Sequence, residues 1–211
     1  MKVELENVKP MEIEKRSFEI ITEELDRELP ADVAPIIKRC IHTSADFDYA
    51  KNLCFSDNVV EKALRALKNG ACIVTDTQMA KSGINKTALA KFGAEAYCFM
   101  SDEDVAEIAK KQGSTRATAS MDKAATLEKP LIFAIGNAPT ALVRLYELIG
   151  EGRLKPELII GVPVGFVNVV QSKELIMQTD VPYIVARGRK GGSNIAACIC
   201  NALLYMAGGR E

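Results

Sequence analysis

The only histidine of the chain, His42, lies in the polar stretch RCIHTSADFDYA, which covers residues 39–50. Histidine has an ordinary pKa of about 6.5, so it can give or take a proton near neutral pH, and His42 is therefore a candidate acid or base. Arg39 precedes it by three residues, which in a helix places a cation and a titratable ring on one face. The alternative for both residues is a packed or solvated position at the end of a surface helix, where the helix dipole favours positive charge. Spacing alone favours that alternative.

Two further sets of basic residues are candidates for binding anions. Arg116 lies among hydroxyl groups in QGSTRATAS, and an arginine in such a setting can bind a carboxylate through two parallel hydrogen bonds. Arg187, Arg189 and Lys190 form the densest basic cluster, in RGRKGGSN. A solvated surface position is the alternative for Arg116, and a solvated turn fits the cluster equally well. GRKGGS lacks the spacing of a P-loop and GVPVGF is not a GxGxxG motif, so neither nucleotide signature is complete.

The six cysteines lie in apolar stretches and lack the paired spacing of a zinc site. Cys198 and Cys200 are too close in sequence for a routine disulfide, and helical residues two apart do not share a face. We therefore predict reduced core cysteines and no bound metal.

Alternating strand and helix patterns predict the elements that position these residues. Short, almost continuously apolar segments, typical of parallel strands covered on both faces, occur at 72–76, 96–100, 131–136, 158–163 and 183–188. Helical segments separate them. The sequence thus predicts an α/β fold, a three-layer α/β/α sandwich with a mainly parallel sheet of about five strands, in a single domain over 1–211.

Local signals predict where several helices begin and end. Two helices, roughly 10–28 and 31–43, precede the first predicted strand, with Pro10 opening the first and Pro30 separating the two. Ser101 with Asp104 resembles a capping box, and Ser193 is placed to cap the last helix. Gly70, Gly113 and Gly150 are placed where helices should stop.

Small and polar residues follow the predicted strands, where open parallel sheets bind their ligands. The segments are TDTQMAKSG (75–83), GNAPT (136–140), GVPVGFVN (161–168) and RGRKGGSN (187–194). Glycine lets backbone approach a ligand closely, and N–H groups at helix starts suit carboxylate or phosphate oxygens. The carboxyl edge of the sheet is therefore the predicted ligand site.

Composition excludes several classes of protein. With 211 residues, of which 48% are hydrophobic, the chain is long enough to bury a real core. The net charge of -1 gives no overall field that would attract nucleic acid or an anionic membrane. No segment approaches the length of a membrane span, and MKVELENVKPMEIEKRSF lacks the apolar stretch of a signal peptide. We expect a cytoplasmic protein without a nucleic-acid or membrane partner.

Seven dispersed segments carry a family resemblance. They are EIEKRSFEII, IKRCIHTSADFDY, GACIVTDTQMAKSGI, STRATASMD, FAIGNAPTAL, ELIIGVPVGFVNVVQSKE and PYIVARGRKGGSNIAACICNAL. Together they cover nearly the whole chain and closely resemble the precorrin-8X methylmutase family, including its cobalt-precorrin-8 form. The resemblance implies a homodimeric isomerase of the corrin pathway, without a metal or cofactor of its own, that moves a ring-C methyl group from carbon 11 to carbon 12 of the macrocycle. The apolar segment NIAACICNALLYM is a candidate contact between copies, with burial inside the chain as the alternative.

The resemblance also implies roles for individual residues. His42 matches the family's general acid, which protonates or hydrogen-bonds a ring nitrogen as the methyl group migrates. The residues matched to substrate-binding positions are Ser17, Arg39, Arg116, Gln78, Met79 and Asn137, and Arg116 is expected to bind a peripheral carboxylate. A corrinoid is a large, flat, apolar ring with acetate and propionate arms, so its site needs scattered donors around an apolar floor.

Two other functions remain open from the sequence. One is a non-catalytic corrinoid-binding or carrier protein, which would hold the product without turnover. The other is a nucleotide-dependent α/β enzyme that uses GRKGGS, which would bind ATP or NAD and ignore tetrapyrroles. Both the cobalt-containing and the metal-free substrate fit the sequence.

Overall fold

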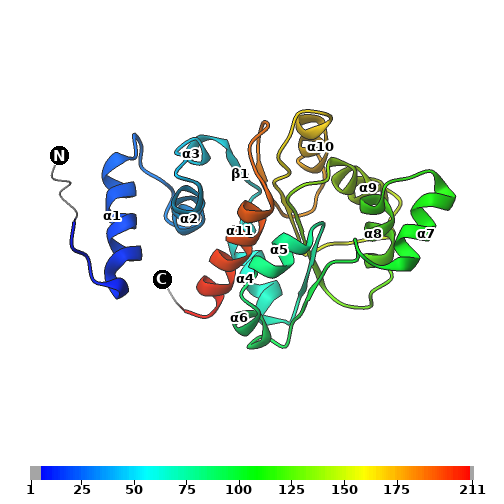
Figure 1. The fold of residues 1–211 in the computed structure, drawn as a ribbon, viewed down its shortest axis with the longest axis horizontal. Helices are drawn as coiled ribbons and strands as arrows, with labels where there is room; N and C mark the ends of the chain where they lie inside the picture. The colour runs from blue at the N-terminus through cyan, green and yellow to red at the C-terminus, as the bar shows by residue number, and fades with distance from the viewer. Residues whose placement is uncertain (1–5, 210–211) are drawn as a thin grey trace.

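A central sheet with helices on both faces organises the protein, whose computed structural model describes residues 6–209 (Figure 1). The sheet has six strands in the order β1-β6-β5-β4-β2-β3. In that order they are Leu53–Phe55, Tyr183–Ala186, Leu158–Gly161, Leu131–Ile135, Cys72–Thr75 and Ala96–Tyr97. All neighbouring pairs are parallel except β1 with β6. The predicted three-layer α/β/α fold with a mainly parallel sheet is confirmed.

The central strands β2, β4 and β5 are buried along their whole length, which explains their continuous apolar sequences. The sixth strand, β1, was not predicted. It has three residues, lies antiparallel at the edge and is only partly buried, so it carries little of the pattern that marks a strand. The strand predicted at 96–100 is shorter, because only Ala96 and Tyr97 pair with β2.

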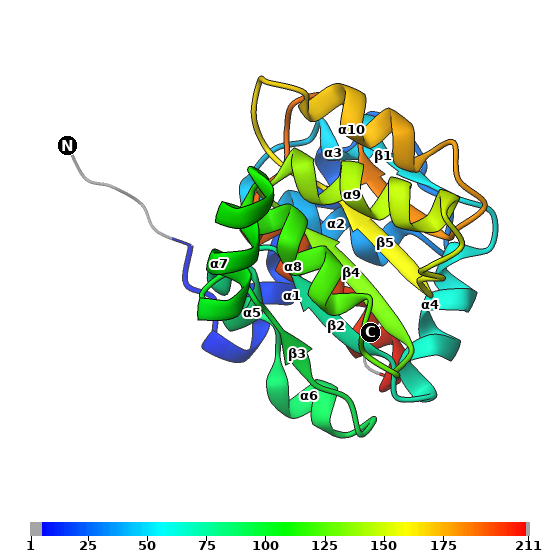
Figure 2. The same cartoon turned by 90° about the vertical axis from the view of Figure 1, so that its right-hand side faces the viewer.

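Each face of the sheet has its own helix layer (Figure 2). One layer contains α2 (Ala34–Ser44), α4 (Val59–Lys68), α5 (Gln78–Gly83), α6 (Lys86–Ala90) and α11 (Ser193–Ala207). The other contains α7 (Glu103–Gln112), α8 (Arg116–Ala124), α9 (Pro139–Gly150) and α10 (Val169–Ile176). The 3-10 turn η1 (Pro10–Glu12) leads into α1 (Ile13–Glu24), which packs outside α2, and the short α3 (Tyr49–Asn52) follows α2 (Figure 1).

The last helix, α11, is buried inside the chain, between α2, α4 and α5 and against the sheet. This burial explains its apolar sequence and removes the reason to regard it as a contact between copies. Among residues 6–209, no helix is long and apolar enough to cross a membrane.

Two predicted helix caps are wrong. The N-cap of α7 is Asp102 rather than Ser101, and no side chain caps this helix. Ser193 is the first residue of α11 rather than its cap, and its hydroxyl lies 2.8 Å from that of Thr77. Gly113 does end α7, in the left-handed conformation at φ 62°. All six cysteines are free, and five of them are buried.

Candidate active site

A buried carboxylate, that of Asp76, organises the carboxyl edge of the sheet. Asp76 follows β2 and accepts hydrogen bonds from the backbone N–H groups of Gly136, Asn137 and Ala138, at 2.8, 2.8 and 2.6 Å. Burial raises the pKa of Asp76, and these hydrogen bonds act in the opposite direction because they stabilise the carboxylate. The GNAPT loop at the start of α9 is thereby fixed to the end of β2. Sequence reasoning missed this role, although an aspartate directly after a buried strand is a visible signal.

Close packing joins this loop to the start of α11. A Cβ atom at Gly136 would lie 2.7 Å from the Cα of Ser193, so only glycine fits there. Thr77, whose hydroxyl meets that of Ser193, also caps α5 by accepting from the N–H of Ala80 at 3.1 Å. The starts of α5, α9 and α11 therefore form one rigid corner.

Three of the predicted site residues lie at this corner. The Gln78 amide donates to the carbonyl of Cys98 at 3.5 Å and to the hydroxyl of Ser101 at 3.3 Å. Met79 is 70% exposed. Asn137 gives its backbone N–H to Asp76 and leaves its side chain exposed. Polar amides and an apolar thioether thus face solvent at the edge where a ligand is expected.

His42 lies in the last turn of α2 and is exposed. Its ring meets Phe18 of α1 edge to face, with the centroids 5.5 Å apart. It lines a hollow of about 220 Å³ together with Ser17, whose hydroxyl donates to the carbonyl of Ile13 in its own helix at 2.9 Å. The neighbouring Thr43 donates to the sulfur of Cys198 at 3.2 Å, which ties this end of α2 to α11. The imidazole is therefore oriented on one side and accessible on the other.

Arg39 lies one turn before His42 and is mostly buried, with 18% of its side chain exposed. Its guanidinium pairs with the carboxylate of Glu14 at 2.7 Å and lies over the rings of Phe18 and Tyr205, at 5.4 and 5.0 Å from their centroids. It borders an apolar hollow of about 630 Å³. Phe18 contacts both Arg39 and His42, so the two share one side of α2, as their spacing suggests.

Within one chain, Arg116 lies apart from His42 and Arg39. It is the exposed first residue of α8, in the other helix layer, and borders a shallow hollow of about 440 Å³ against α7. The hydroxyl of Thr115 caps α8 and contacts that of Thr140 at 2.9 Å, which places this helix start beside that of α9. The hollows at His42, Arg39 and Arg116 are separate.

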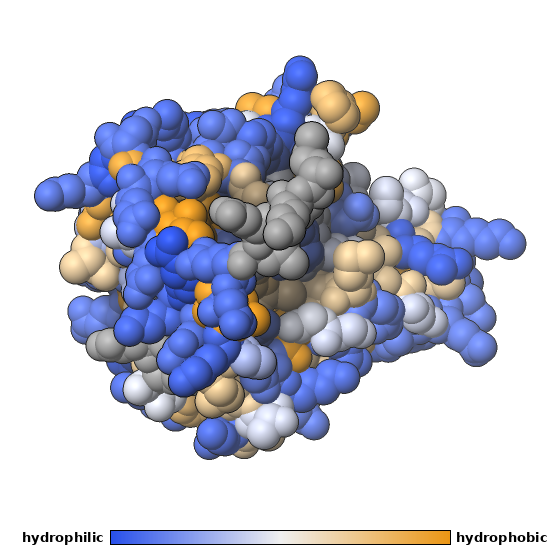
Figure 3. Space-filling model, turned by 60° about the vertical axis from the view of Figure 1, so that its left-hand side comes forward, coloured by the Kyte–Doolittle hydropathy of each residue, from blue (hydrophilic) through white to orange (hydrophobic). Residues whose placement is uncertain are grey.

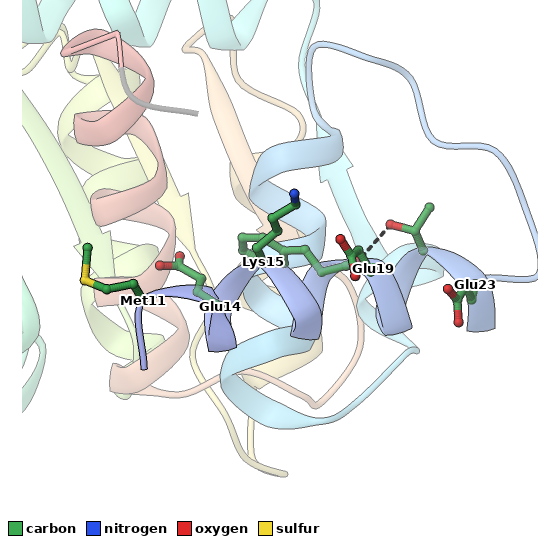
Figure 4. Close-up of a pocket in the computed structure, with 7 residues that line it drawn as sticks. Met11, Glu14, Lys15, Glu19 and Glu23 are labelled. Atoms are coloured by element: carbon green, nitrogen blue, oxygen red, sulfur yellow. Dashed lines mark hydrogen bonds between the residues drawn. The ribbon is translucent and has the colours of Figure 1, made fainter. Parts of the chain in front are cut away.

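A hollow of about 680 Å³ along α1 is a poor site for a carboxylate ligand (Figure 4). Glu14, Glu19 and Glu23 line it with Lys15, and their negative charges would repel carboxylates. On this side of the molecule, Figure 3 shows hydrophobic residues only in small areas among hydrophilic ones. Among the residues that the structure describes, no group of three or more His, Cys, Asp or Glu could hold a metal ion.

Comparison with known proteins points to one family. Residues 12–206, which include all seven candidate site residues, match the family model described as precorrin-8X methylmutase. The chain is 45% identical over 201 residues to cobalt-precorrin-8 methylmutase of Priestia megaterium, covering 95% of this chain and 89% of that protein. It is 48% identical over 204 residues to the protein of the same name from Salmonella typhimurium, covering 93% and 95%.

A solved structure agrees with these sequence matches. The crystal structure of precorrin-8X methylmutase from Thermus thermophilus superposes with a TM-score of 0.85 at 37% identity, covering 94% of this chain and 98% of that one. Similarity of this extent in sequence and fold means that the chain belongs to the precorrin-8X methylmutase family.

Proposed function

We propose that this methylmutase acts in cobalamin (vitamin B12) biosynthesis and moves the ring-C methyl group of precorrin-8 or cobalt-precorrin-8 from carbon 11 to carbon 12. The product is hydrogenobyrinate or cobyrinate. The names of the relatives support the reaction. The observation that carries the mechanism is the accessible ring of His42, the only histidine, beside a hollow lined by Ser17.

His42 acts as the general acid. As the bond from carbon 11 to the methyl carbon breaks and the bond to carbon 12 forms, electron density shifts toward a ring nitrogen. The imidazole donates a proton or a hydrogen bond to that nitrogen, which stabilises the transition state where charge develops. The step uses no nucleophile or redox cofactor, and any cobalt belongs to the substrate. Edge-to-face contact with Phe18 orients the ring for this transfer.

Arg39 and Arg116 bind carboxylate arms of the substrate. Arg39 already binds a carboxylate, that of Glu14, while its guanidinium lies over two aromatic rings. A substrate carboxylate takes over this contact as the half-exposed Glu14 side chain moves into solvent. Ser17, Gln78, Met79 and Asn137 contribute further polar and apolar contacts to the substrate.

The active form is a homodimer in the cytoplasm. Within one chain, His42, Arg39 and Arg116 border three different hollows, and the one of about 220 Å³ beside His42 is small for a corrinoid. A second copy of the chain supplies the missing walls. In a two-fold dimer, each subunit contributes the same surface patch to the interface, so each copy completes the site of the other in the same way.

Incubation of the purified protein with cobalt-precorrin-8 and with metal-free precorrin-8 tests the proposal, with the visible spectrum as readout. Conversion to the corrin chromophore is expected, and the faster substrate identifies the physiological form. Binding of the product without turnover would indicate a carrier instead. Binding of ATP or NAD with indifference to both tetrapyrroles would indicate a nucleotide-dependent enzyme.

A further inference from the structure

The basic cluster that follows β6 contains one arginine without an acidic partner. Arg187 pairs with Glu174 at 2.9 and 3.2 Å. Lys190 pairs with both Asp46 and Asp48 at 2.6 Å. Within residues 6–209, Arg189 pairs with no carboxylate, and it is exposed.

Arg189 rests instead on an exposed aromatic ring. Its guanidinium carbon lies 5.2 Å from the centroid of Phe166, which is 78% exposed. Val164 and Val167 of the same loop are 49% and 78% exposed. Apolar side chains gathered on a surface mark binding sites, and a guanidinium over a ring keeps its N–H edge available for a carboxylate. The pair therefore offers one charged and one apolar contact side by side.

The loop that carries Arg189 is held rigidly. The N–H of Gly192 donates to the carbonyl of Val162 at 2.9 Å, and the N–H of Gly165 donates to the carbonyl of Arg189 at 3.1 Å. These two bonds join the loop after β5 to the loop after β6. A Cβ at Gly191 would lie 2.0 Å from the carbonyl oxygen of Val162, so the two backbones are in direct contact.

A buried lysine of α10 holds the backbone on both sides of Arg189. Lys173 is fully buried, and its ammonium group donates to the carbonyls of Gly188 and Lys190 at 2.8 and 2.9 Å. A buried charge without a carboxylate is costly, and these two carbonyls are the partners it has. Lys173 therefore fixes the backbone on both sides of Arg189, whose guanidinium has no carboxylate partner within residues 6–209.

We propose that Arg189 binds a peripheral carboxylate of the corrinoid, that Phe166 contacts the apolar part of the same ligand, and that Lys173 positions the loop between them. The inference rests on the proposed function, because it takes the corrinoid as ligand. The loop lies beside the end of α2, the helix that carries His42, since Lys190 pairs with Asp46 and Asp48 in the turn that follows this helix. A corrinoid, with carboxylate arms around an apolar ring, matches such a pair of contacts.

Titration of hydrogenobyrinate into Arg189→Gln and Arg187→Gln, followed by the visible spectrum, tests the proposal. Each change removes one positive charge, and the two positions are two residues apart on one loop. Because a charged hydrogen bond is lost, Arg189→Gln should raise Kd about tenfold at low salt, whereas Arg187→Gln should change it less than twofold. With the carboxylates of the ligand converted to amides, wild type and Arg189→Gln should bind alike. Phe166→Ala should weaken binding of both the carboxylate and the amide form of the ligand.

Each other outcome has a distinct meaning. Equal affinity of the wild type and Arg189→Gln for hydrogenobyrinate would overturn the inference while leaving the proposed function intact. Equal loss in both arginine variants would show only a general effect of charge and would also overturn it. A changed sedimentation coefficient with unchanged affinity would assign the pair to a contact between copies, against the inference. Failure of the wild type to bind any corrinoid would contradict the proposed function itself.

Discussion

At the scale of single residues, Phe18 of α1 contacts both the proposed acid, His42, and the proposed carboxylate-binding Arg39. The three-residue spacing of Arg39 and His42 suggested one helix face, and both contact Phe18. The partner of Arg39, Glu14, comes from a separate helix, and no local pattern relates the two positions. For Asp76 the position after a buried strand was a visible signal, but its three donors lie sixty or more residues away and no local pattern identifies them.

Arg116→Ala should weaken binding of the product while leaving the fold intact. Arg116 is exposed and has no ion pair in the described part of the chain, so its loss should change the free energy of unfolding by less than about 0.5 kcal/mol. If it binds a carboxylate that the complex desolvates, binding should weaken by roughly 2–5 kcal/mol, and by far less if the pair stays exposed. Spectral titration measures this. Arg65→Ala, at another exposed arginine, should bind as the wild type does, and unchanged affinity in Arg116→Ala would remove Arg116 from the site.

Asp76→Asn should destabilise the protein by about 1–3 kcal/mol, the cost of one buried donor left without a partner. The carboxylate of Asp76 accepts from three N–H groups with two oxygens, whereas asparagine has one oxygen and turns an NH₂ group toward a donor. Urea unfolding measures the change, with the exposed Asp57→Asn as control. Equal stability of the two variants would mean that Asp76 does not hold the loop.

At the scale of elements, the largely buried strands were predicted, β3 was predicted longer than it is, and β1, α5 and α8 were not predicted. Strands β2, β4, β5 and β6 were predicted from apolar segments, which are typical of a sheet that helices cover on both faces. The helices α5 and α8 were not predicted, because α5 has only six residues and the buried face of α8 consists largely of small residues such as Ala117, Ser120 and Ala124. Their starts are fixed by threonine caps, at Thr77 and Thr115, which are local signals that could have been used.

The buried Lys173 of α10, which donates to two carbonyls of the loop after β6, should make the free energy of unfolding depend on pH. Burial lowers the pKa of Lys173 to about 8, from an ordinary value of 10.5. Between these pH values the unfolded chain holds a proton that the folded chain has released, so raising the pH favours the folded state. Relative to Lys173→Met, the wild type should therefore gain about 1 kcal/mol in free energy of unfolding per pH unit in this window.

Urea unfolding from pH 7 to 10.5 measures this slope. The exposed Lys91→Met serves as control and should keep the slope of the wild type, because its amine is solvated in both states. A Lys173→Met variant with the same slope as the wild type would mean that the buried amine titrates normally.

At the scale of the whole molecule, the fold was predictable and the complete site was not. A parallel sheet brings the strand ends to one edge by geometry, so Gln78, Met79 and Asn137 were expected to lie near one another. Arg116 and His42 lie on helices of opposite layers, and no pattern in one chain relates them. That residues 1–211 act as one domain stays a prediction.

Sedimentation velocity at micromolar concentration tests the homodimer. We expect a species of twice the 23.0 kDa chain mass, because His42, Arg39 and Arg116 border three different hollows of one chain. Addition of hydrogenobyrinate should not dissociate it, since the ligand would be enclosed by both copies. A single 23.0 kDa species with and without ligand would contradict the dimer.

The turnover of His42→Ala tests the proposed role of His42 as the catalytic acid. The ring is exposed and its one aromatic contact within residues 6–209 is the edge-to-face contact with Phe18, so the variant should fold and should bind the product as the wild type does. A positioned acid contributes on the order of 10²–10⁴ in rate, so the single-turnover rate measured from the visible spectrum should fall by that factor. Turnover by His42→Ala at the wild-type rate would contradict the claim, and the shape of the site alone would then have to promote the methyl shift.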